Sequence, residues 1–366
     1  MQPAIRNDSA AEPPGPGRGA LTPARLLRGF GLFVLLTAVA FWFLSRRGTL
    51  GENVFENLRT IHPLALAIAC LPAFLDQLLG GLRIRVCAHA LGSRIGLWPC
   101  VLANCANVFL GGVTPSQHAG GPAQIWILVR NGMRFTTATV TSFCTYLGTV
   151  TFFLMLAVAL PYVTDGATLG GAARVFTRAA ALLFAGTLAV GALALPRPGS
   201  VNRAMHAVLV RIPRFGTRLA TSAAVRGLER LFEDYSLLMR RAVRTGKLQL
   251  AAVVGLSTLI YLNKFFVAYI VVRGFDLHPP LREVLQLQAV QALVTYFVPT
   301  PGASGVAEVT AAELMDGIVP TATMGAFILV WRATSLYLGM ALGAAALFAT
   351  GFGRAARRAS SAASTT

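Results

Sequence analysis

The sequence predicts an all-α, polytopic membrane protein, a helix bundle of about six full spans with two broken helical hairpins. Of its 366 residues, 55 % are hydrophobic and only 13 % are charged, whereas a soluble domain carries about 25 % charged residues. Several apolar runs reach the length of about 20 residues that a helix needs to cross a bilayer. Two further runs contain Pro and Gly clusters that an uninterrupted membrane helix would not carry.

Six apolar runs are expected to be full spans: residues 29–45, 60–82, 135–160, 178–196, 248–272 and 322–349. In the first run, Ala38-Val39-Ala40 resembles a signal-peptidase site, but the apolar stretch continues beyond it, so we interpret it as a retained anchor. The membrane domain is expected over residues 29–352. Residues 1–28 and 353–366 are expected to be a disordered cytoplasmic N-terminus and a disordered cytoplasmic tail.

The distribution of basic residues predicts the orientation. The net charge is +18, and 11 of the 32 basic residues lie between Arg197 and Lys247. Such an excess favours cytoplasmic loops and contact with anionic lipid, so nucleic acid is not an expected partner. The same rule places segments 83–94 and 130–134 inside and segments 161–174 and 273–283 outside. We therefore expect a multi-pass protein of the cell (inner) membrane with both termini cytoplasmic.

Residues 197–247 are expected to form a basic amphipathic connector on the cytoplasmic side. The apolar positions of its two predicted faces are Val201, Met205, Val208 and Leu209, then Leu228, Leu231, Phe232, Tyr235 and Leu238. An amphipathic helix with arginines on its other face can bind anionic headgroups at the membrane surface. A solvated connector between two halves of the bundle is the equally weighted alternative.

The two broken runs are residues 95–129, with GGVTPSQHAGGPAQ at Gly111–Gln124, and residues 284–312, with TPGASGVAE at Thr300–Glu308. The predicted orientation requires each run to enter and leave on one side, and the two to enter from opposite sides. They are re-entrant hairpins or pairs of short spans. Asn107 to Pro115 is echoed weakly by Thr295 to Pro301. Paired breaks of this kind are typical of inverted-topology repeats, which place the substrate near the bilayer midplane.

After each Thr-Pro pair, Gly residues lead into a helix whose first N–H groups and partial positive charge suit an anion such as a phosphate. The candidate substrate-binding residues are Thr114, Ser116, Gln117, His118, Gly120, Gly121 and Gln124 in the first break, and Thr300, Gly302, Ser304, Gly305 and Glu308 in the second. The alternative is that these Gly and Pro residues only allow close helix packing, since both are common in membrane helices.

Four charged residues fall inside the membrane runs: Asp76, Lys264, Glu308 and Arg332. An unpaired charge at a helix centre costs about 2.5–3.5 kcal/mol on insertion scales. We therefore expect two pairs, Glu308 with Arg332 and Asp76 with Lys264, although Lys264 alone could extend to the membrane surface.

The sequence offers no signature of catalysis. It has no GxxxxGK[ST], HExxH or GxSxG motif, and its five cysteines form no CxxC. We expect no enzymatic activity, no cofactor and no metal site.

The segments FLGGVTPSQHAGGPAQIWILVRNGM and VPTPGASGVAE resemble the two signature segments of the lysylphosphatidylglycerol synthase transmembrane region, a family also described as flippase-like. The matching positions are Thr114, Pro115, Gly120, Gly121, Gln124 and Gly132, then Pro299, Pro301, Gly302, Gly305 and Glu308. Ala303 stands where the family usually has a second Gly, and Gln124 where Glu or another polar residue is frequent. The resemblance covers about residues 25 to 350.

The resemblance implies lipid translocation, because the best understood family members flip a lipid that a fused synthase domain has aminoacylated. No such domain is found in this sequence. We expect a flippase that moves an anionic or modified phospholipid, or a lipid-linked intermediate, across the bilayer. A non-catalytic membrane partner of a lipid-modifying enzyme, and a membrane enzyme that acts on headgroups with Glu308 as base, are the alternatives. Expected partners are membrane lipids and a lipid-modifying enzyme, and a homodimer is left open.

Overall fold

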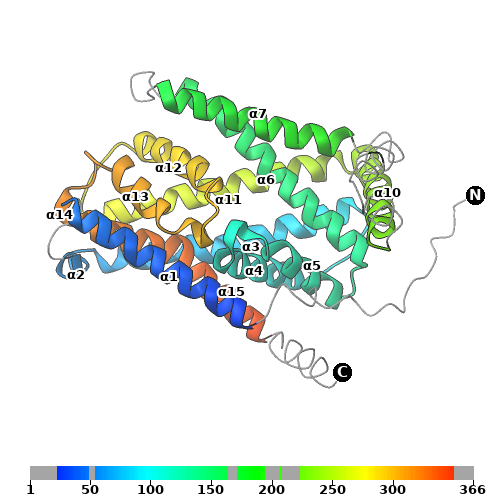
Figure 1. Ribbon diagram of the computed structural model, residues 1–366, viewed down its shortest axis with the longest axis horizontal. Coiled ribbons are helices and arrows are strands. Elements are labelled where there is room, and N and C mark those ends of the chain that lie inside the picture. Colours follow the sequence, from blue (N-terminus) through cyan, green and yellow to red (C-terminus); the bar gives the residue numbers. More distant parts are fainter. Residues whose placement is uncertain (1–22, 49–53, 164–170, 194–206, 208–222, 350–366) are drawn as a thin grey trace, which may run out of the picture.

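The computed structural model describes residues 23–48, 54–163, 171–193, 207 and 223–349. In these residues the protein is helical and contains no strand (Figure 1). The helices are α1 (Pro23–Arg46), α2 (Val54–Asn57), α3 (Pro63–Ala90), α4 (Leu97–Val113), α5 (Gly120–Arg130), α6 (Phe135–Val163), α7 (Gly171–Leu193), α10 (Ala223–Thr245), α11 (Lys247–Gly274), α12 (Leu281–Tyr296), α13 (Val306–Leu314), α14 (Thr321–Arg332) and α15 (Leu338–Ala349). Three short segments interrupt them: the 3-10 turns η1 (Pro115–Gln117) and η2 (Pro301–Ala303), and the π-helical turn η3 (Ala333–Tyr337).

The described part of the chain contains six helices long and apolar enough to cross a membrane. They comprise Arg28–Arg46, Pro63–Ala90, Phe135–Tyr162, Val175–Ala192, Lys247–Gly274 and Thr321–Phe348. These are the six predicted spans, with some boundaries extended. The predicted fold class is therefore confirmed: the chain is an all-α, multi-pass membrane protein.

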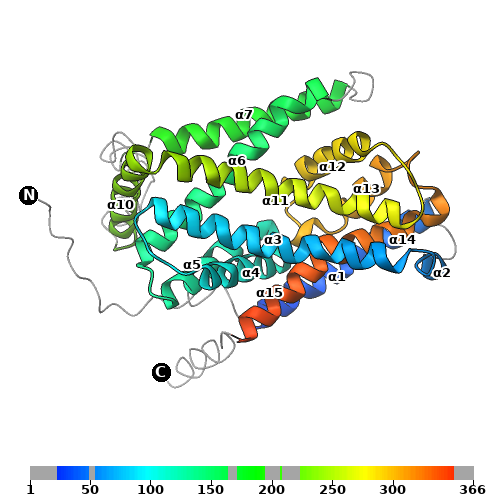
Figure 2. The same ribbon diagram turned by 180° about the vertical axis from the view of Figure 1, so that it is seen from behind.

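The order of elements around the first break is repeated around the second. A helix of 28 residues, α3 or α11, is followed by a hairpin with a 3-10 turn at its tip and then by a second long helical segment. Helices α3 and α11 lie side by side and run in opposite directions (Figure 2). The N–H of His62, before α3, donates to the carbonyl of Gly274 at the end of α11, and Ala90 lies beside Gly246 at the other end. This antiparallel repetition is the order of elements that the predicted inverted-topology repeat requires; its orientation in the membrane stays a prediction.

The two hairpins open toward opposite ends of this helix pair. Residues of both arms of the first hairpin, Cys100 and Leu128, pack with Ala88 near the end of α3. Residues of both arms of the second, Val284 and Met315, pack with Val272 near the end of α11. Because α3 and α11 are antiparallel, the hairpins enter from opposite ends. Their insertion into a membrane as re-entrant elements stays a prediction.

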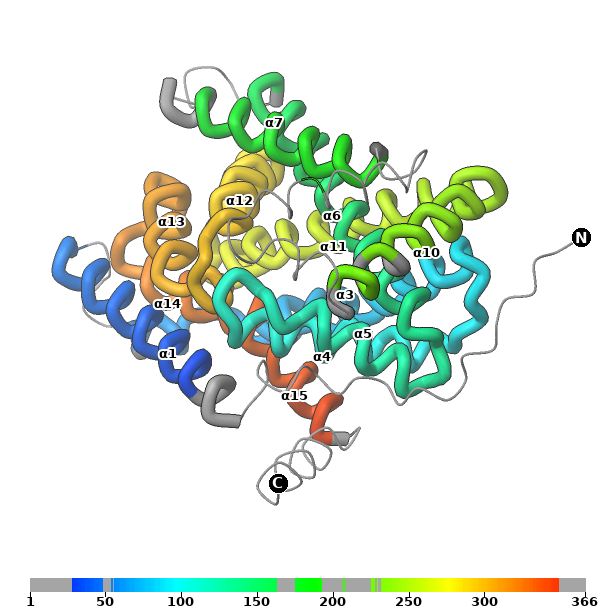
Figure 3. The backbone as a smooth tube through the Cα atoms, turned by 45° about the vertical axis from the view of Figure 1, so that its right-hand side comes forward, coloured from blue at the N-terminus to red at the C-terminus, as the bar shows by residue number. Residues whose placement is uncertain are grey.

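Helix α1 lies at the edge of the bundle and contacts both broken hairpins (Figure 3). Gly29 is packed against the backbone of Val113, directly before the first break. One turn further along α1, the ring of Phe33 lies against Gly302 in the second break. A side chain at position 29 would collide with the Val113 carbonyl, so Gly29 permits this close approach. Helix α1 therefore covers one side of both breaks.

One predicted boundary is wrong. Residues 83–94 were expected to be a cytoplasmic loop, but α3 continues to Ala90, so Arg83 and Arg85 are helical. The Arg83 guanidinium donates to the hydroxyls of Thr149 and Ser257, at 2.9 and 3.1 Å. These hydroxyls come from α6 and α11, and they make the charge tolerable inside the bundle.

The amphipathic connector is described only in part. Helix α10 places Tyr235 and Leu238 toward the bundle, and Tyr235 is buried, whereas Phe232 is half-buried and outside this cluster. The predicted positions Val201, Met205, Val208 and Leu209 lie outside the described residues, as do the tails 1–22 and 350–366. The side chains of Leu228 and Leu231 also lie outside the described part of the structure.

Candidate functional site

The first break is a sharp turn between α4 and α5. Thr114 is extended and its hydroxyl donates to the carbonyl of Leu110 at 2.6 Å, which closes the end of α4. The same hydroxyl oxygen accepts the N–H of Ala119 at 3.3 Å, so it also caps the approach to α5. Between them, Ser116 and Gln117 adopt left-handed φ angles of 51° and 57°. The side chains of Ser116, Gln117 and His118 are exposed.

The second break begins with a turn of similar shape but is less exposed, with Pro301 and Ser304 buried. Gly302 and Ala303 adopt left-handed φ angles of 56° each, after Thr300 and Pro301. The Thr300 hydroxyl donates to the carbonyl of Ser304 at 2.9 Å, and the Ser304 hydroxyl donates to the carbonyl of Pro301 at 2.8 Å. Ser304 is 1 % exposed. The donors predicted for a ligand at Thr300 and Ser304 are therefore used to hold the turn.

The tips of the two hairpins touch. The N–H of Ser116 in the first break donates to the carbonyl of Pro299, just before the second break, at 3.0 Å. The turns η1 and η2 are also in direct contact. The structure thus brings together two segments that are separated by more than 180 positions in the sequence. This contact between chain breaks entering from opposite ends defines the candidate site.

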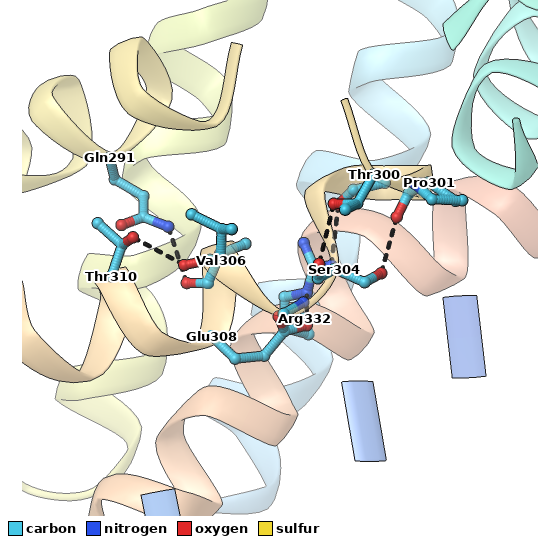
Figure 4. A network of polar contacts seen from close by, with 11 residues as sticks. Gln291, Thr300, Pro301, Ser304, Val306, Glu308, Thr310 and Arg332 are labelled. Atoms are coloured by element: carbon cyan, nitrogen blue, oxygen red, sulfur yellow. Dashed lines mark hydrogen bonds and ion pairs between the residues drawn. The ribbon is translucent and has the colours of Figure 1, made fainter. Parts of the chain in front are cut away.

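A buried ion pair holds the second break (Figure 4). Glu308 Oε1 lies 2.9 Å from Arg332 Nε, and their side chains are 0 % and 6 % exposed. Glu308 Oε2 also accepts the N–H of Gly305 at 2.8 Å, which caps α13. Arg332 donates through its Nη2 to the carbonyl of Gly302 at 3.0 Å. The predicted pairing of Glu308 with Arg332 is confirmed, and the pair connects the turn, α13 and α14.

This arrangement changes the predicted role of Glu308. A carboxylate at the first turn of a helix neutralises the partial positive charge there. Glu308 occupies that position in α13 and accepts the free N–H of Gly305 itself. The N-terminus of α13 is therefore already supplied with an anion from its own chain. Glu308 is a positioning residue for the break, whereas the first turn of α5, after the other break, carries no acidic residue.

Neutral amides hold the first break. The side chain of Asn107 in α4 donates to Gln124 Oε1 at 2.7 Å, and Gln124 Nε2 donates to the Ser142 hydroxyl in α6 at 2.9 Å. Gln124 is buried, so each of these contacts satisfies a polar group away from solvent. Gly120 lies against the Asn107 amide, whereas the space beside the Gly121 Cα is open. Gln124, a predicted site residue, thus connects three helices.

The second predicted ion pair is also present. Asp76 Oδ1 in α3 lies 3.7 Å from Lys264 Nζ in α11. Nearby, Asn104 in α4 donates to Gln77 Oε1 at 2.9 Å. These contacts lie along the α3–α11 pair and do not touch either break. We therefore separate Asp76 and Lys264 from the candidate site.

Three residues that hold the breaks were not predicted as site residues. They are Asn107, Ser142 and Gln291, whose side chain donates to the carbonyl of Ala307 at 2.9 Å. The available signal was weak, because each is one of several uncharged polar residues in its run. The covering role of Phe33 in α1 had no signal in the sequence, because it depends on how α1 packs.

Comparison with known proteins agrees with this architecture. Residues 30–343 match the family model of the lysylphosphatidylglycerol synthase TM region. A UPF0104 membrane protein from Archaeoglobus fulgidus is 25 % identical over 326 residues, which cover 86 % of this chain and 94 % of the relative. The matched region includes both breaks and all four intramembrane charges. The resemblance inferred from the two Thr-Pro segments is thereby confirmed.

Proposed function

Because the chain belongs to the family of the lysylphosphatidylglycerol synthase TM region, we propose that it moves an anionic or modified phospholipid, or a lipid-linked intermediate, across the cell membrane. The observation that carries the proposal is the contact between the two breaks, Ser116 N–H to Pro299 carbonyl. Irregular backbone at membrane depth is tolerated where it is buried in protein or lines a wet cavity. Transporters with inverted repeats place their substrate at such broken helices.

The two breaks contribute differently to this proposed path. The exposed side chains of Ser116, Gln117 and His118 offer hydrogen-bond donors beside the first turn of α5. The open space at Gly121 leaves room next to this helix end. A headgroup phosphate can accept hydrogen bonds there, while its acyl chains stay in the lipid. The second break, fixed by Glu308 and Arg332, supports this surface from the other side.

The proposal is tested with liposomes that contain the purified chain and a fluorescently labelled phosphatidylglycerol or lysylphosphatidylglycerol. Added dithionite bleaches only the outer leaflet, so the rate of further bleaching reports movement between leaflets. We expect faster movement than in empty liposomes, and a loss of at least about tenfold in Glu308→Gln, because a misplaced binding surface costs at least one to two decades. The matched control is Glu313→Gln, which lies on the same helix but is exposed.

Two alternatives predict different outcomes. If wild type moves none of the labelled anionic lipids faster than empty liposomes, the transport proposal is wrong. A new covalent product in the lipid extract would indicate a membrane enzyme acting on headgroups. A tolerated Glu308→Gln, together with loss of a co-purifying lipid-modifying enzyme in other variants, would indicate a membrane partner. The cytoplasmic position of both termini belongs to the same proposal and is tested by tags at each end.

A further inference from the structure

A basic cavity lies at the end of the bundle where α3 ends and α11 begins. Its volume is about 690 Å³, and its lining includes Arg85, His89, Ser93, Arg94 and Arg241. The arginines come from three places: α3, the α3–α4 connection and α10. No residue of either break lines the cavity. It is therefore separate from the candidate site described above.

The charged side chains that line this cavity are all basic. Three of its lining residues are arginines, and none of the described lining residues is acidic. Nε of Arg85 is buried and makes no hydrogen bond to the described residues. Guanidinium groups stay charged and present a planar fork that matches the oxygens of a phosphate. Like charges gathered without an acid repel one another, and a bound anion would relieve this repulsion.

The backbone around the cavity keeps the arginines together. Helix α3 ends through hydrogen bonds from Gly92 N–H to the His89 carbonyl and from Ser93 N–H to the Ala88 carbonyl. Gly92 has a left-handed φ of 83°, and the Arg241 guanidinium lies directly against it. A side chain at position 92 would meet Arg241 at 3.2 Å. The glycine thus turns the chain and leaves room for the guanidinium of α10.

We propose that this cavity binds a phosphate group, as a phosphomonoester or a phosphodiester, through Arg85, Arg94 and Arg241, with Ser93 as a further donor. The phosphate belongs to a lipid headgroup or to a soluble compound. The competing explanation is purely structural: Arg241 offsets the partial negative charge at the C-terminus of α3. That explanation accounts for one arginine near the helix end, but not for Arg85 and Arg94 around the same cavity.

The test uses the full chain purified in detergent, with two probes: phosphatidylglycerol, followed by native mass spectrometry, and inorganic phosphate, used as a competitor. The variant is Arg94→Gln/Arg241→Gln. Both side chains are exposed, so these substitutions are expected to leave the packed core intact. The control is Arg134→Gln, an exposed arginine after α5 that does not line the cavity. We expect binding to weaken about tenfold for each guanidinium removed, because a hydrogen bond to a charged group contributes about one decade of affinity.

The outcomes distinguish a lipid headgroup from a soluble phosphate compound, and they test the cavity separately from the transport proposal. Displacement of the lipid by inorganic phosphate indicates a soluble ligand, and resistance to displacement indicates a lipid headgroup; both support the cavity. Equal binding by wild type and the double variant, an equal loss in Arg134→Gln, or binding of neither probe to wild type overturns it. Because no residue of either break lines the cavity, Arg94→Gln/Arg241→Gln is expected to leave lipid movement in the liposome assay unchanged. The cavity proposal and the transport proposal can therefore fail independently.

Discussion

The first break places Ser116 and Gln117 at φ angles of 51° and 57°, and the second places Gly302 and Ala303 at 56° each. The two turns therefore share one backbone shape, each after a Thr-Pro pair. Their surroundings differ. Amides hold the first hairpin through Gln124, and an ion pair of 2.9 Å holds the second through Glu308.

The two hairpins differ in how many of their polar side chains are used by contacts within the chain. In the second break, hydroxyls, the carboxylate and the guanidinium are all used by contacts within the chain. In the first break, the side chains of Ser116, Gln117 and His118 remain exposed. One hairpin is thus suited to hold the junction, and the other to meet a ligand. Under the proposed function, two turns of similar backbone shape therefore have different roles because their side chains differ.

The largest expected effect comes from breaking the buried ion pair. Glu308→Gln can still accept the Gly305 N–H, but it leaves the Arg332 charge buried without a counter-ion. Breaking one partner of a buried pair costs about 3–5 kcal/mol. We expect a large fall in the thermal unfolding midpoint in detergent, and a double variant, Glu308→Gln/Arg332→Gln, that loses less than the sum of the single variants.

Strict additivity of the two single variants would contradict coupling between Glu308 and Arg332. A matched substitution in the first hairpin is Gln124→Ala, which removes neutral hydrogen bonds to Asn107 and Ser142. Its cost is expected to be about 1–3 kcal/mol, because it leaves neutral rather than charged groups unsatisfied. If Gln124→Ala lowers the unfolding midpoint more than Glu308→Gln does, the inferred difference between the two hairpins is wrong.

The second prediction concerns the shared backbone shape and has opposite signs in the two breaks. Gly302→Ala adds a Cβ at a φ of 56°, close to Phe33 and Leu336, and a left-handed residue with a Cβ costs about 1–2 kcal/mol. Ser116→Gly removes such a penalty and should raise stability by less than about 1 kcal/mol, because glycine also loses more entropy on folding. The measurement is again the unfolding midpoint. If Gly302→Ala and Ser116→Gly shift it in the same direction, the two turns do not share the same backbone strain.

Much of this fold follows from the sequence because its signals are local. The length of the apolar runs predicts the six spans, and the Pro and Gly clusters predict both breaks. The two ion pairs were predictable as well, since two acids and two bases inside apolar runs must offset one another. The similarity around Asn107 was too weak to establish the antiparallel repetition by itself, and the membrane orientation that the arginine count predicts stays a prediction.

Other features depend on partners far away in the chain. Arg83 was placed in a loop because a charge normally ends a span, yet hydroxyls of Thr149 and Ser257 keep it inside the bundle. Nothing local shows that Ser116 and Gln117 adopt left-handed angles, since neither is Gly. The capping of α13 by Glu308 likewise depends on the direction of one side chain after a turn. Such details require the tertiary structure.

The smallest effect is expected at the other ion pair of α13, between Arg47 and Glu313. Their charged groups are 3.5 Å apart, and the side chains are 57 % and 63 % exposed. Exposed pairs contribute about 0–1 kcal/mol, and Arg47 also keeps its contact with the Phe43 ring, at 4.4 Å from the centroid. Glu313→Gln should therefore leave the unfolding midpoint nearly unchanged. A loss as large as that of Glu308→Gln would mean that charge on α13, rather than burial at the break, stabilises the second hairpin.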